Sequence, residues 1–307
     1  MTTDLSAETQ LDLNGVSVVD TFAEAFPMTG TRLIITAYTA AWARQAAQEF
    51  CGNATSVIAC DLETALEREV PESETPDGRP GVSVLAFAFD KKGLETAVTN
   101  RVGQCILTCP TTACFNGLPT DDKDKKINIG GQVRFFGDGY QSSKKLGSQR
   151  FWRIPVMDGE FLCEEKFGTV KGVGGGNLLI AGDSTEHALT ATEAAANAMR
   201  EVADVILPFP GGIVRSGSKV GSKYKKLKAS TNHEYCPTLQ GQVDLKIPVE
   251  TQAVYEIVID GLSEQAVADA MKAGLHAAAS CPGVLMITAG NYGGKLGKFH
   301  FHLKDLL

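Results

Sequence analysis

The stretch Leu33-Ile-Ile-Thr-Ala-Tyr-Thr-Ala-Ala-Trp-Ala-Arg-Gln-Ala-Ala-Gln-Glu-Phe50 indicates the fold class. Its first residues are an apolar run that fits a buried strand, and its alanine-rich part from Ala40 onward is a good helix former. A second strand is predicted at residues 56–60. The chain therefore contains a strand–helix–strand unit, a building block of folds in which helices pack on a sheet.

Three more units of this kind are predicted along the chain. They lie at Val82–Phe89, Leu94–Val102 and Cys105–Thr108; at Asn177–Ala181, Glu186–Ala203 and Val205–Leu207; and at Ala253–Asp260, Glu264–Ala279 and Val284–Thr288, before a last strand at Lys298–Leu303. Two units fall on each side of residue 150. The pattern predicts an α+β protein of two similar α/β sandwich lobes, residues 1–150 and 151–307. Each lobe is expected to be a ferredoxin-like split βαβ with a mostly antiparallel sheet.

Two polar stretches separate these predicted elements. Glu67–Pro80 is acidic and carries three prolines, which predicts a long surface loop. Leu118–Gln149 is polar and contains several glycines, and we interpret it as the region between the lobes or as an exposed excursion.

The composition is that of a globular protein, with 43% hydrophobic residues and a net charge of −7 over 307 residues. The apolar runs are too short to cross a bilayer, and the acidic balance does not favour nucleic-acid binding. The polar start, residues 1–14, does not resemble a signal peptide. A cytoplasmic protein is therefore expected, with its eight cysteines as reduced thiols.

A basic island lies between Val205 and His233, where no acidic residue occurs. Its charges are Arg215, Lys219, Lys223, Lys225, Lys226 and Lys228. Such a cluster in an acidic protein indicates a local anionic ligand, and a solvated loop is the competing interpretation.

The glycine-rich segments do not match nucleotide-binding signatures, which disfavours a nucleotide-linked oxidoreductase. Gly172–Gly176 precedes its predicted strand, whereas the dinucleotide fingerprint follows one. Gly290–Leu296 lacks the spacing and the Ser or Thr of a phosphate loop. His300 and His302 alternate on the last strand without a visible third ligand, so we interpret them as structural and predict no metal site.

Glu256 is the strongest candidate for acid–base chemistry. In Val254-Tyr-Glu-Ile-Val258 it shares a strand face with two valines, and a carboxyl in apolar surroundings has a raised pKa. A neutral carboxyl can donate a hydrogen bond to a developing oxyanion and can pass protons. A glutamate at a sheet edge, or one paired with a lysine, would explain the same pattern.

Several sequence blocks in a fixed order carry a family resemblance. They are Thr21–Phe26, Glu74–Gly81, Arg101–Cys105, Phe135–Tyr140, Phe209–Val214, Ser218–Lys223, Ala229–Asn232, Val254–Val258 and Ala289–Gly297. In these blocks the chain resembles the formylmethanofuran:tetrahydromethanopterin formyltransferase family, from about Leu13 to Leu307.

The resemblance implies an activity and a mode of assembly. The family moves a formyl group between the amine of methanofuran and N5 of tetrahydromethanopterin, two C1 carriers that act as substrates. It implies no metal and no permanently bound cofactor, a homo-oligomer that is typically a tetramer, and two similar α/β lobes. It also matches Glu256 to the glutamate proposed as catalytic in this family.

The biological setting implied by the resemblance leaves an alternative function open. In methylotrophic bacteria similar subunits work with a formylmethanofuran hydrolase, so hydrolase subunits are further expected partners. A non-catalytic subunit that binds a carrier in such a complex is the alternative to a transferase. Loss of Glu256 or of the block Phe209–Lys223 would indicate that alternative, and both are present.

Substrate contacts are predicted in the family blocks and in the basic island. The predicted residues are Phe136, Asp138, Tyr140, Gly211, Gly212, Ser218, Lys219, Lys223, Lys225, Lys226, Lys228, Asn232, Tyr235 and Asn291. For Asn232, Tyr235 and Asn291, ordinary turn roles beside glycines fit as well as alignment of a formamide. Because both carriers are amines, direct attack in a ternary complex is expected, without a serine or cysteine nucleophile.

Overall fold

The computed structural model describes residues 10–55, 60–217 and 219–307. The chain forms two compact units: a middle unit, Met28–Gly172, and a terminal unit, made of the chain up to Pro27 together with Val173–Leu307. The predicted boundary at residue 150 instead falls inside strand β9 (Gln149–Val156) of the middle unit. The division differs from the prediction because two long strands, β3 (Phe22–Thr36) and β12 (Val170–Gly182), each contribute to both units.

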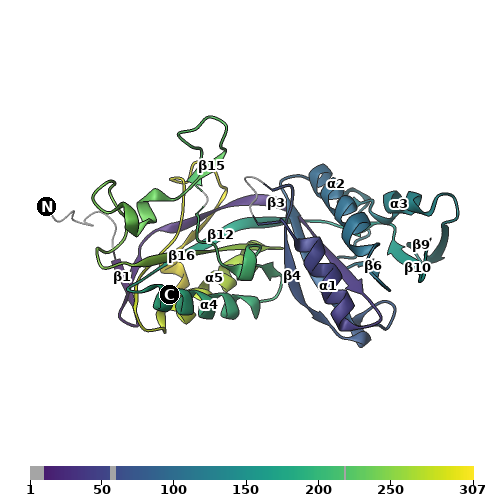
Figure 1. Cartoon of the computed structure of the whole chain (residues 1–307), viewed down its shortest axis with the longest axis horizontal. Coiled ribbons are helices and arrows are strands. Elements are labelled where there is room, and N and C mark those ends of the chain that lie inside the picture. The colour runs from purple at the N-terminus through teal and green to yellow at the C-terminus, as the bar shows by residue number, and fades with distance from the viewer. Residues whose placement is uncertain (1–9, 56–59, 218) are drawn as a thin grey trace. The chain divides into compact units, whose positions relative to one another are not determined.

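The middle unit is built on a split βαβ arrangement. Its chain order is β3, α1 (Ala40–Cys51), β4 (Glu63–Val70), β5 (Gly81–Ala88), α2 (Lys91–Arg101) and β6 (Ala113–Asn116). The strands pair antiparallel in the order β4–β5–β3–β6. Both helices pack on one face of this sheet, over a core that includes Leu33, Phe50, Val84 and Leu94 (Figure 1).

Helix α1 forms because its sequence supplies a cap and an apolar stripe. The side chain of Thr39 accepts a hydrogen bond from the backbone N–H of Trp42. Ala43, Ala46 and Phe50 are buried at helical spacing against the sheet. The predicted helix at Ala40–Phe50 is therefore confirmed.

The sheet of the middle unit continues beyond β6. Its remaining elements are η3 (Lys123–Lys125), β7 (Lys126–Ile127), α3 (Gly130–Val133), η4 (Arg134–Gly137), β8 (Ser142–Leu146), β9, β10 (Gly159–Glu164) and β11 (Phe167–Gly168). Strand β10 pairs parallel with β6, β9 and β8 follow antiparallel, and β7 pairs with β11. The predicted excursion Leu118–Gln149 is thus part of the middle unit.

Two predicted strands of this unit are misplaced. Residues 56–59 of the first lie outside the described residues, and the strand after α1 is β4, whose charged side chains hide its alternation. Cys105–Thr108 is not a strand, because Val102–Ile106 forms a π-helical turn, η2, that continues α2 and buries both of its end residues. The predicted loop Glu67–Pro80 begins only after β4 and contains the 3-10 turn η1 (Glu72–Glu74).

The terminal unit repeats the same topology. Its chain order is β12, α4 (Thr185–Arg200), β13 (Val205–Ile206), β16 (Ala253–Gly261), α5 (Glu264–Ala279) and β17 (Val284–Thr288). The strands pair antiparallel in the order β13–β16–β12–β17. The predicted split βαβ topology is therefore confirmed in both units.

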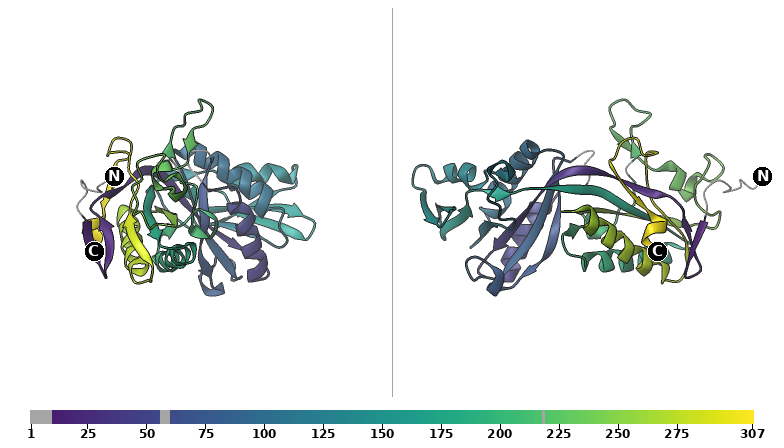
Figure 2. Two further views of the ribbon diagram at one scale, coloured as in Figure 1. Left: turned by 60° about the vertical axis from the view of Figure 1, so that its left-hand side comes forward. Right: turned by 180° about the vertical axis from the view of Figure 1, so that it is seen from behind.

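Three strands and one turn complete the terminal unit. They are β1 (Gln10–Leu13), β2 (Val16–Val19), β18 (Phe299–His302) and η8 (Leu303–Leu306). Helices α4 and α5 lie next to each other on one face of the sheet, over a core that includes Leu178, Ile257 and Ile287 (Figures 1 and 2). None of the helices in the described residues combines the length and apolar character needed to cross a membrane. All eight cysteines are free thiols, as predicted.

The connection between β13 and β16, residues 207–252, packs on the other face of this sheet. Its described parts contain only short elements: η5 (Pro210–Gly212), β14 (Lys219–Val220), β15 (Ala229–Ser230), η6 (His233–Tyr235) and η7 (Pro237–Leu239). A small second core of Val19, Ala181, Ile247 and Met286 forms there, with Tyr235 packed against it. On the face of β16 away from α4 and α5, Glu256 is therefore buried, whereas Val254 and Val258 are half-buried.

Candidate active site

Glu256 lies in the middle of β16, on the sheet face away from α4 and α5. Its neighbour Ile257 points into the helix-side core, so strand alternation places Glu256 on the opposite face. Leu179 of β12 is its cross-strand partner on one side. On the other side the backbone N–H of Glu256 donates to the carbonyl of Val214 at 2.9 Å, and Val214 donates back at 2.8 Å. Pairing on both sides fixes the backbone that carries this carboxyl.

The carboxyl of Glu256 is buried without compensation. The residue is 7% exposed, and its Oε2 atom is enclosed with no hydrogen-bond partner among the described residues. Burial disfavours the charged form and raises the pKa of Glu256 to about 7. The neutral carboxyl is therefore well populated at neutral pH and can act as a hydrogen-bond donor.

A small cleft of about 30 Å³ opens over Glu256. Its lining comes from β12, β16 and the connection 207–252: Leu179, Val214, Arg215, Ser216, Gly217, Thr231, Asn232, Tyr235, Cys236, Val254, Tyr255 and Glu256. The predicted residues Asn232 and Tyr235 are thus brought together with Glu256. Arg215 was counted in the basic island but was not predicted as a site residue, although it directly follows the block Phe209–Val214.

Local hydrogen bonds shape the wall of the cleft opposite Glu256. The N–H of Tyr235 donates to the carbonyl of Asn232 at 2.9 Å, and the thiol of Cys236 donates to the same carbonyl at 3.4 Å. Gly217 has a φ of +66°, and a Cβ there would lie 2.8 Å from the Asn232 side chain. A glycine is therefore required at Gly217 for Asn232 to reach the cleft.

Gly211 and Gly212 form a turn that leads into the cleft without lining it. Their φ values are +63° and +80°, a region that favours glycine. The guanidinium of Arg200 donates to the carbonyl of Gly211 at 2.5 Å. The turn directly precedes Ile213 and Val214, and the backbone of Val214 pairs with that of Glu256.

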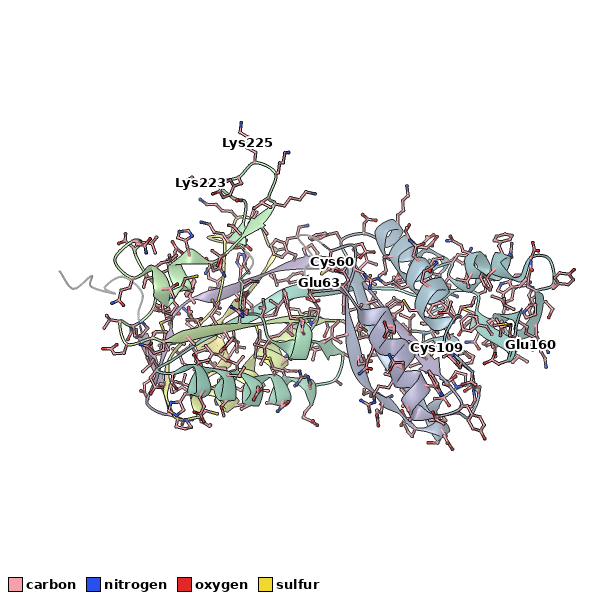
Figure 3. The ribbon with its side chains drawn as sticks, in the orientation of Figure 1. Cys60, Glu63, Cys109, Glu160, Lys223 and Lys225 are labelled. Carbon is pink, nitrogen blue, oxygen red and sulfur yellow. The ribbon has the colours of Figure 1, made fainter. Side chains whose placement is uncertain are left out.

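The predicted lysines lie on an exposed hairpin, the basic loop, which runs from β14 to β15. Lys219 lies on β14, where its Nζ is 3.3 Å from Nδ1 of His233. The other lysines of the basic loop are all exposed: Lys223, Lys225, Lys226 and Lys228. Figure 3 shows Lys223 and Lys225 pointing away from the ribbon of the terminal unit. The predicted Ser218 lies outside the described residues.

Three predicted residues belong to the middle unit, whereas the cleft lining belongs wholly to the terminal unit. The side chain of Phe136, on η4, is exposed, and Tyr140 is 82% exposed. Asp138 has a left-handed backbone conformation with a φ of +50°. The N–H of Tyr140 donates to the carbonyl of Gly137, which closes the turn.

Asn291 has the turn role that the sequence left open. Its amide donates to the Thr21 hydroxyl at 3.0 Å and to the Phe22 carbonyl at 3.1 Å, and its oxygen accepts from the N–H of Gly293. His300 and His302 likewise pack on the ring of Phe22, with centroids 4.9 and 5.2 Å away.

Glu24 is a second buried glutamate, and sequence reasoning did not single it out. It is 1% exposed, and its two oxygens accept four backbone hydrogen bonds, from Tyr292, Gly294, Leu296 and Gly297, at 2.6–2.8 Å. Burial acts to raise the pKa of this carboxyl, but the four N–H groups together lower the pKa below its ordinary value. Its sequence signal, one carboxyl within the apolar strand Phe22–Phe26, resembles that of Glu256.

Comparison with known proteins identifies relatives over nearly the full chain. Two family models match: "Formylmethanofuran-tetrahydromethanopterin formyltransferase" over residues 11–156, and "FTR, proximal lobe" over residues 159–306. A formylmethanofuran–tetrahydromethanopterin formyltransferase of Methylococcus capsulatus is 56% identical over 298 residues, covering 96% of this chain and 99% of the relative.

Two solved structures share the fold closely. The formylmethanofuran:tetrahydromethanopterin formyltransferase of Methanosarcina barkeri gives a TM-score of 0.90 at 50% identity, covering 97% of this chain and 100% of the other. A chain of the formyltransferase/hydrolase complex from Methylorubrum extorquens, solved with methylofuran, gives 0.93 at 51% identity, covering 97% and 99%.

Proposed function

The chain belongs to the formylmethanofuran–tetrahydromethanopterin formyltransferase family, and from this premise we propose that Glu256 is the acid–base group of its formyl transfer. The protein is a transferase that moves a formyl group between the amine of a methanofuran-type carrier and N5 of tetrahydromethanopterin. The observation that supports the role of Glu256 is its enclosed Oε2 atom, which has no hydrogen-bond partner among the described residues.

The reaction requires charge stabilisation and one proton movement. The attacking amine forms a C–N bond to the formyl carbon, and the carbonyl oxygen becomes an oxyanion. Collapse breaks the other C–N bond, the attacking nitrogen loses a proton, and the leaving amine gains one. A neutral Glu256 donates a hydrogen bond to the oxyanion and passes the proton between the two nitrogens. No covalent enzyme intermediate is needed, so we propose direct attack in a ternary complex.

The basic loop is proposed to hold the anionic part of a carrier. Methanofuran-type carriers of this family have a tail of glutamate carboxylates, and tetrahydromethanopterin has a phosphate and carboxylates. Lys219, Lys223, Lys225, Lys226 and Lys228 offer positive charges on one exposed hairpin of the unit that contains Glu256. Such a loop attracts and steers a flexible anionic tail. In the middle unit, the proposed substrate contacts are Phe136, Asp138 and Tyr140.

The alternative function is a carrier-binding subunit without catalysis. This alternative is considered because the structure of a related chain was solved within a formyltransferase/hydrolase complex. The orphan carboxyl of Glu256 favours the transferase, because an uncompensated buried acid costs stability and a binding role does not require it. We further propose a homo-oligomer, a tetramer in the family pattern, that works in the cytoplasm in one-carbon metabolism and associates with hydrolase subunits in a methylotroph.

A formyl-transfer assay with both purified carriers tests this proposal. The chain alone and the chain with its hydrolase partners are compared by absorbance, at varied concentrations of both substrates. Intersecting initial-rate lines support the ternary complex, whereas parallel lines or a formylated side chain in mass spectrometry contradict it. Activity is expected to survive a chelator. Activity that appears only with added hydrolase subunits would support the carrier-binding alternative.

A further inference from the structure

Three sequence motifs that the Glu256 cleft does not use meet in one place of the terminal unit. The start of β3 supplies Glu24 and Phe26, β12 supplies Gly175, and the segment after β17 supplies Tyr292. The rings of Phe26 and Tyr292 pack with centroids 6.2 Å apart. Gly175 lies at a bulge of β12 with a φ of +94°, and a Cβ there would be 3.4 Å from the Phe26 ring. The glycines predicted to precede this strand therefore lie inside it, and the positive φ of Gly175 favours glycine at the bulge.

The segment Gly290–Gly297, called here the Tyr292 loop, is folded around a single carboxylate. Each oxygen of Glu24 accepts two N–H groups from it, Tyr292 and Gly294 on Oε2 and Leu296 and Gly297 on Oε1. Two further hydrogen bonds join the start of the loop to β12. The N–H of Gly290 donates to the side chain of Asn177 at 2.6 Å, and that side chain donates back to the Gly290 carbonyl at 3.2 Å. Hydrogen bonds thus hold the loop both at its start and along its later residues.

The Tyr292 loop leaves the sheet on the same face as Glu256. Leu179 of β12 lies directly opposite Glu256 on the neighbouring strand β16 and opposite Thr288 on the neighbouring strand β17. The three side chains therefore lie on the same face of the sheet. The loop begins two residues after Thr288. Asn177, which is hydrogen-bonded to the start of the loop, lies two residues before Leu179 and so on the same face. Tyr292 and Glu256 therefore belong to one surface of the sheet.

Electrostatics agree with this placement. Burial, and then the negative charges of Glu256 and Glu24, raise the pKa of the Tyr292 phenol. The other titratable groups around the Glu256 cleft are Arg215, Tyr235, Cys236 and Tyr255. The phenol therefore carries its proton at neutral pH and can act as a hydrogen-bond donor.

We propose that Tyr292 is a second hydrogen-bond donor to the oxyanion of formyl transfer, beside Glu256, and that Glu24 is the residue that positions it. The proposal rests on the function proposed above for Glu256. A phenol and a neutral carboxyl can together form an effective oxyanion site when both donors face the same oxygen before the charge develops. Tyr292 keeps its proton throughout. Only its hydrogen bond strengthens as the carbonyl oxygen becomes an oxyanion.

Four variants of the full chain test the proposal: Tyr292→Phe, Glu24→Gln, the double variant, and Tyr38→Phe as a control on an exposed tyrosine of the middle unit. Tyr292→Phe keeps the ring on Phe26 and is expected to lower kcat about 10²-fold with little change in KM, the scale for loss of one oxyanion donor. This loss should be constant between about pH 6 and 9, because the phenol does not titrate there. Tyr38→Phe should leave both constants unchanged.

Glu24→Gln tests the positioning role. Its amide nitrogen cannot accept the two N–H groups that one carboxylate oxygen accepts, so the loop shifts and kcat falls. The double variant should lose no more than Tyr292→Phe alone, since Glu24 acts through Tyr292. If Glu24→Gln does not fold by circular dichroism, Glu24→Asp, which keeps both acceptor oxygens on a side chain one methylene shorter, takes its place in the same cycle.

The outcomes separate this inference from the proposed function. Normal kcat in folded Tyr292→Phe overturns the role of Tyr292, and losses that add in the double variant overturn the positioning role of Glu24. If Glu256→Gln is impaired while Tyr292→Phe is normal, only this inference fails. If Glu256→Gln keeps full activity, the proposed function itself fails.

Discussion

Glu24 and Glu256 are two buried glutamates on the same face of one sheet, and their environments are opposite. Glu24 is 1% exposed and accepts four backbone hydrogen bonds, which keep it ionised. Glu256 is 7% exposed, and its enclosed oxygen has no partner among the described residues. The hydrogen-bond donors around Glu24 therefore lower the pKa of its carboxyl, whereas burial raises the pKa of Glu256 to about 7.

Hydrogen-bond donors, and not burial alone, thus decide the protonation state of a buried acid. A carboxylate surrounded by N–H groups holds a loop in place, because its charge is satisfied only in that conformation. A carboxyl without donors destabilises the fold when charged, and that cost is retained where the chemistry requires a neutral acid. Changing either glutamate therefore tests this difference.

Removal of the Glu24 carboxylate is expected to lower the free energy of unfolding more than any other change considered. Glu24→Ala leaves four buried N–H groups of the Tyr292 loop without an acceptor, and we expect a loss of about 3–5 kcal/mol in the free energy of unfolding, measured with urea. The stabilisation by Glu24 should be present above its ordinary pKa of 4.5 and should be lost as the pH falls through its lowered folded pKa. A loss below about 1 kcal/mol would show that water replaces the carboxylate easily.

Glu256 should show the opposite dependence of stability on pH. Its pKa rises from 4.5 to about 7 on folding, so the folded state binds more protons between these values and stability falls as the pH rises through that window. Above pH 7 the cost is constant at about 3 kcal/mol. Glu256→Gln cannot ionise, so its stability relative to the wild type should improve by about this amount between pH 4 and pH 8.

The matched control for this measurement is Glu193→Gln, which changes an exposed glutamate on α4. Its stability relative to the wild type should not vary with pH in this window. Equal pH curves for Glu256→Gln and the wild type would mean that Glu256 is as solvated in the folded chain as in the unfolded chain.

Activity should depend on the proton of Glu256. Glu256→Gln keeps the size of the side chain but cannot pass a proton, and we expect a rate loss of about 10²-fold or more, the usual scale for general acid–base groups. The wild-type rate should fall as the pH rises through about 7, because the carboxyl then loses its proton. Near-normal turnover of folded Glu256→Gln at saturating substrate contradicts the assignment.

The sequence predicted elements whose signals are local. α5 and β17 have the predicted bounds, because an alanine-rich apolar stripe begins after the cap Ser263 and a β-branched run follows it. β4 was missed since its charged residues resemble a loop, and Cys105–Thr108 was misplaced since an apolar π-helical turn resembles a strand. The structural units divide elsewhere than at residue 150, because β3 and β12 each run through both units.

The candidate site shows the same limit. Glu256, Asn232 and Tyr235 were predicted from neighbours in the sequence, and the structure places them around one cleft. Glu24 sits in an equally clear apolar strand, but its four donors lie about 270 residues further along the chain. No local pattern can tell a carboxyl that will find donors from one that will not. The two strands therefore look alike in the sequence and differ in the hydrogen-bond partners of their carboxyl groups.

A much smaller effect, on KM, is expected from changing exposed lysines that are neither buried nor held by hydrogen bonds. Lys225, Lys226 and Lys228 are exposed on the basic loop, so each pair that they form with a tail carboxylate is worth only about 0–1 kcal/mol and is screened by salt. Changing all three to alanine should raise KM for the furan carrier several-fold at low ionic strength, because several weak attractions are lost together. The value of kcat should stay near normal, since no lysine of this set contacts the cleft over Glu256.

Salt separates this electrostatic effect from a change in the fold of the loop. The rise in KM should shrink toward the wild-type value as ionic strength increases, because the wild type loses the same attraction. A triple change of Lys144, Lys145 and Lys166, exposed lysines of the middle unit, removes an equal charge and should leave KM for the furan carrier unchanged. If the basic-loop variant keeps the wild-type KM at low ionic strength, its lysines are only solvated. Carrier binding in the terminal unit then depends on the cleft over Glu256 rather than on the charges around it.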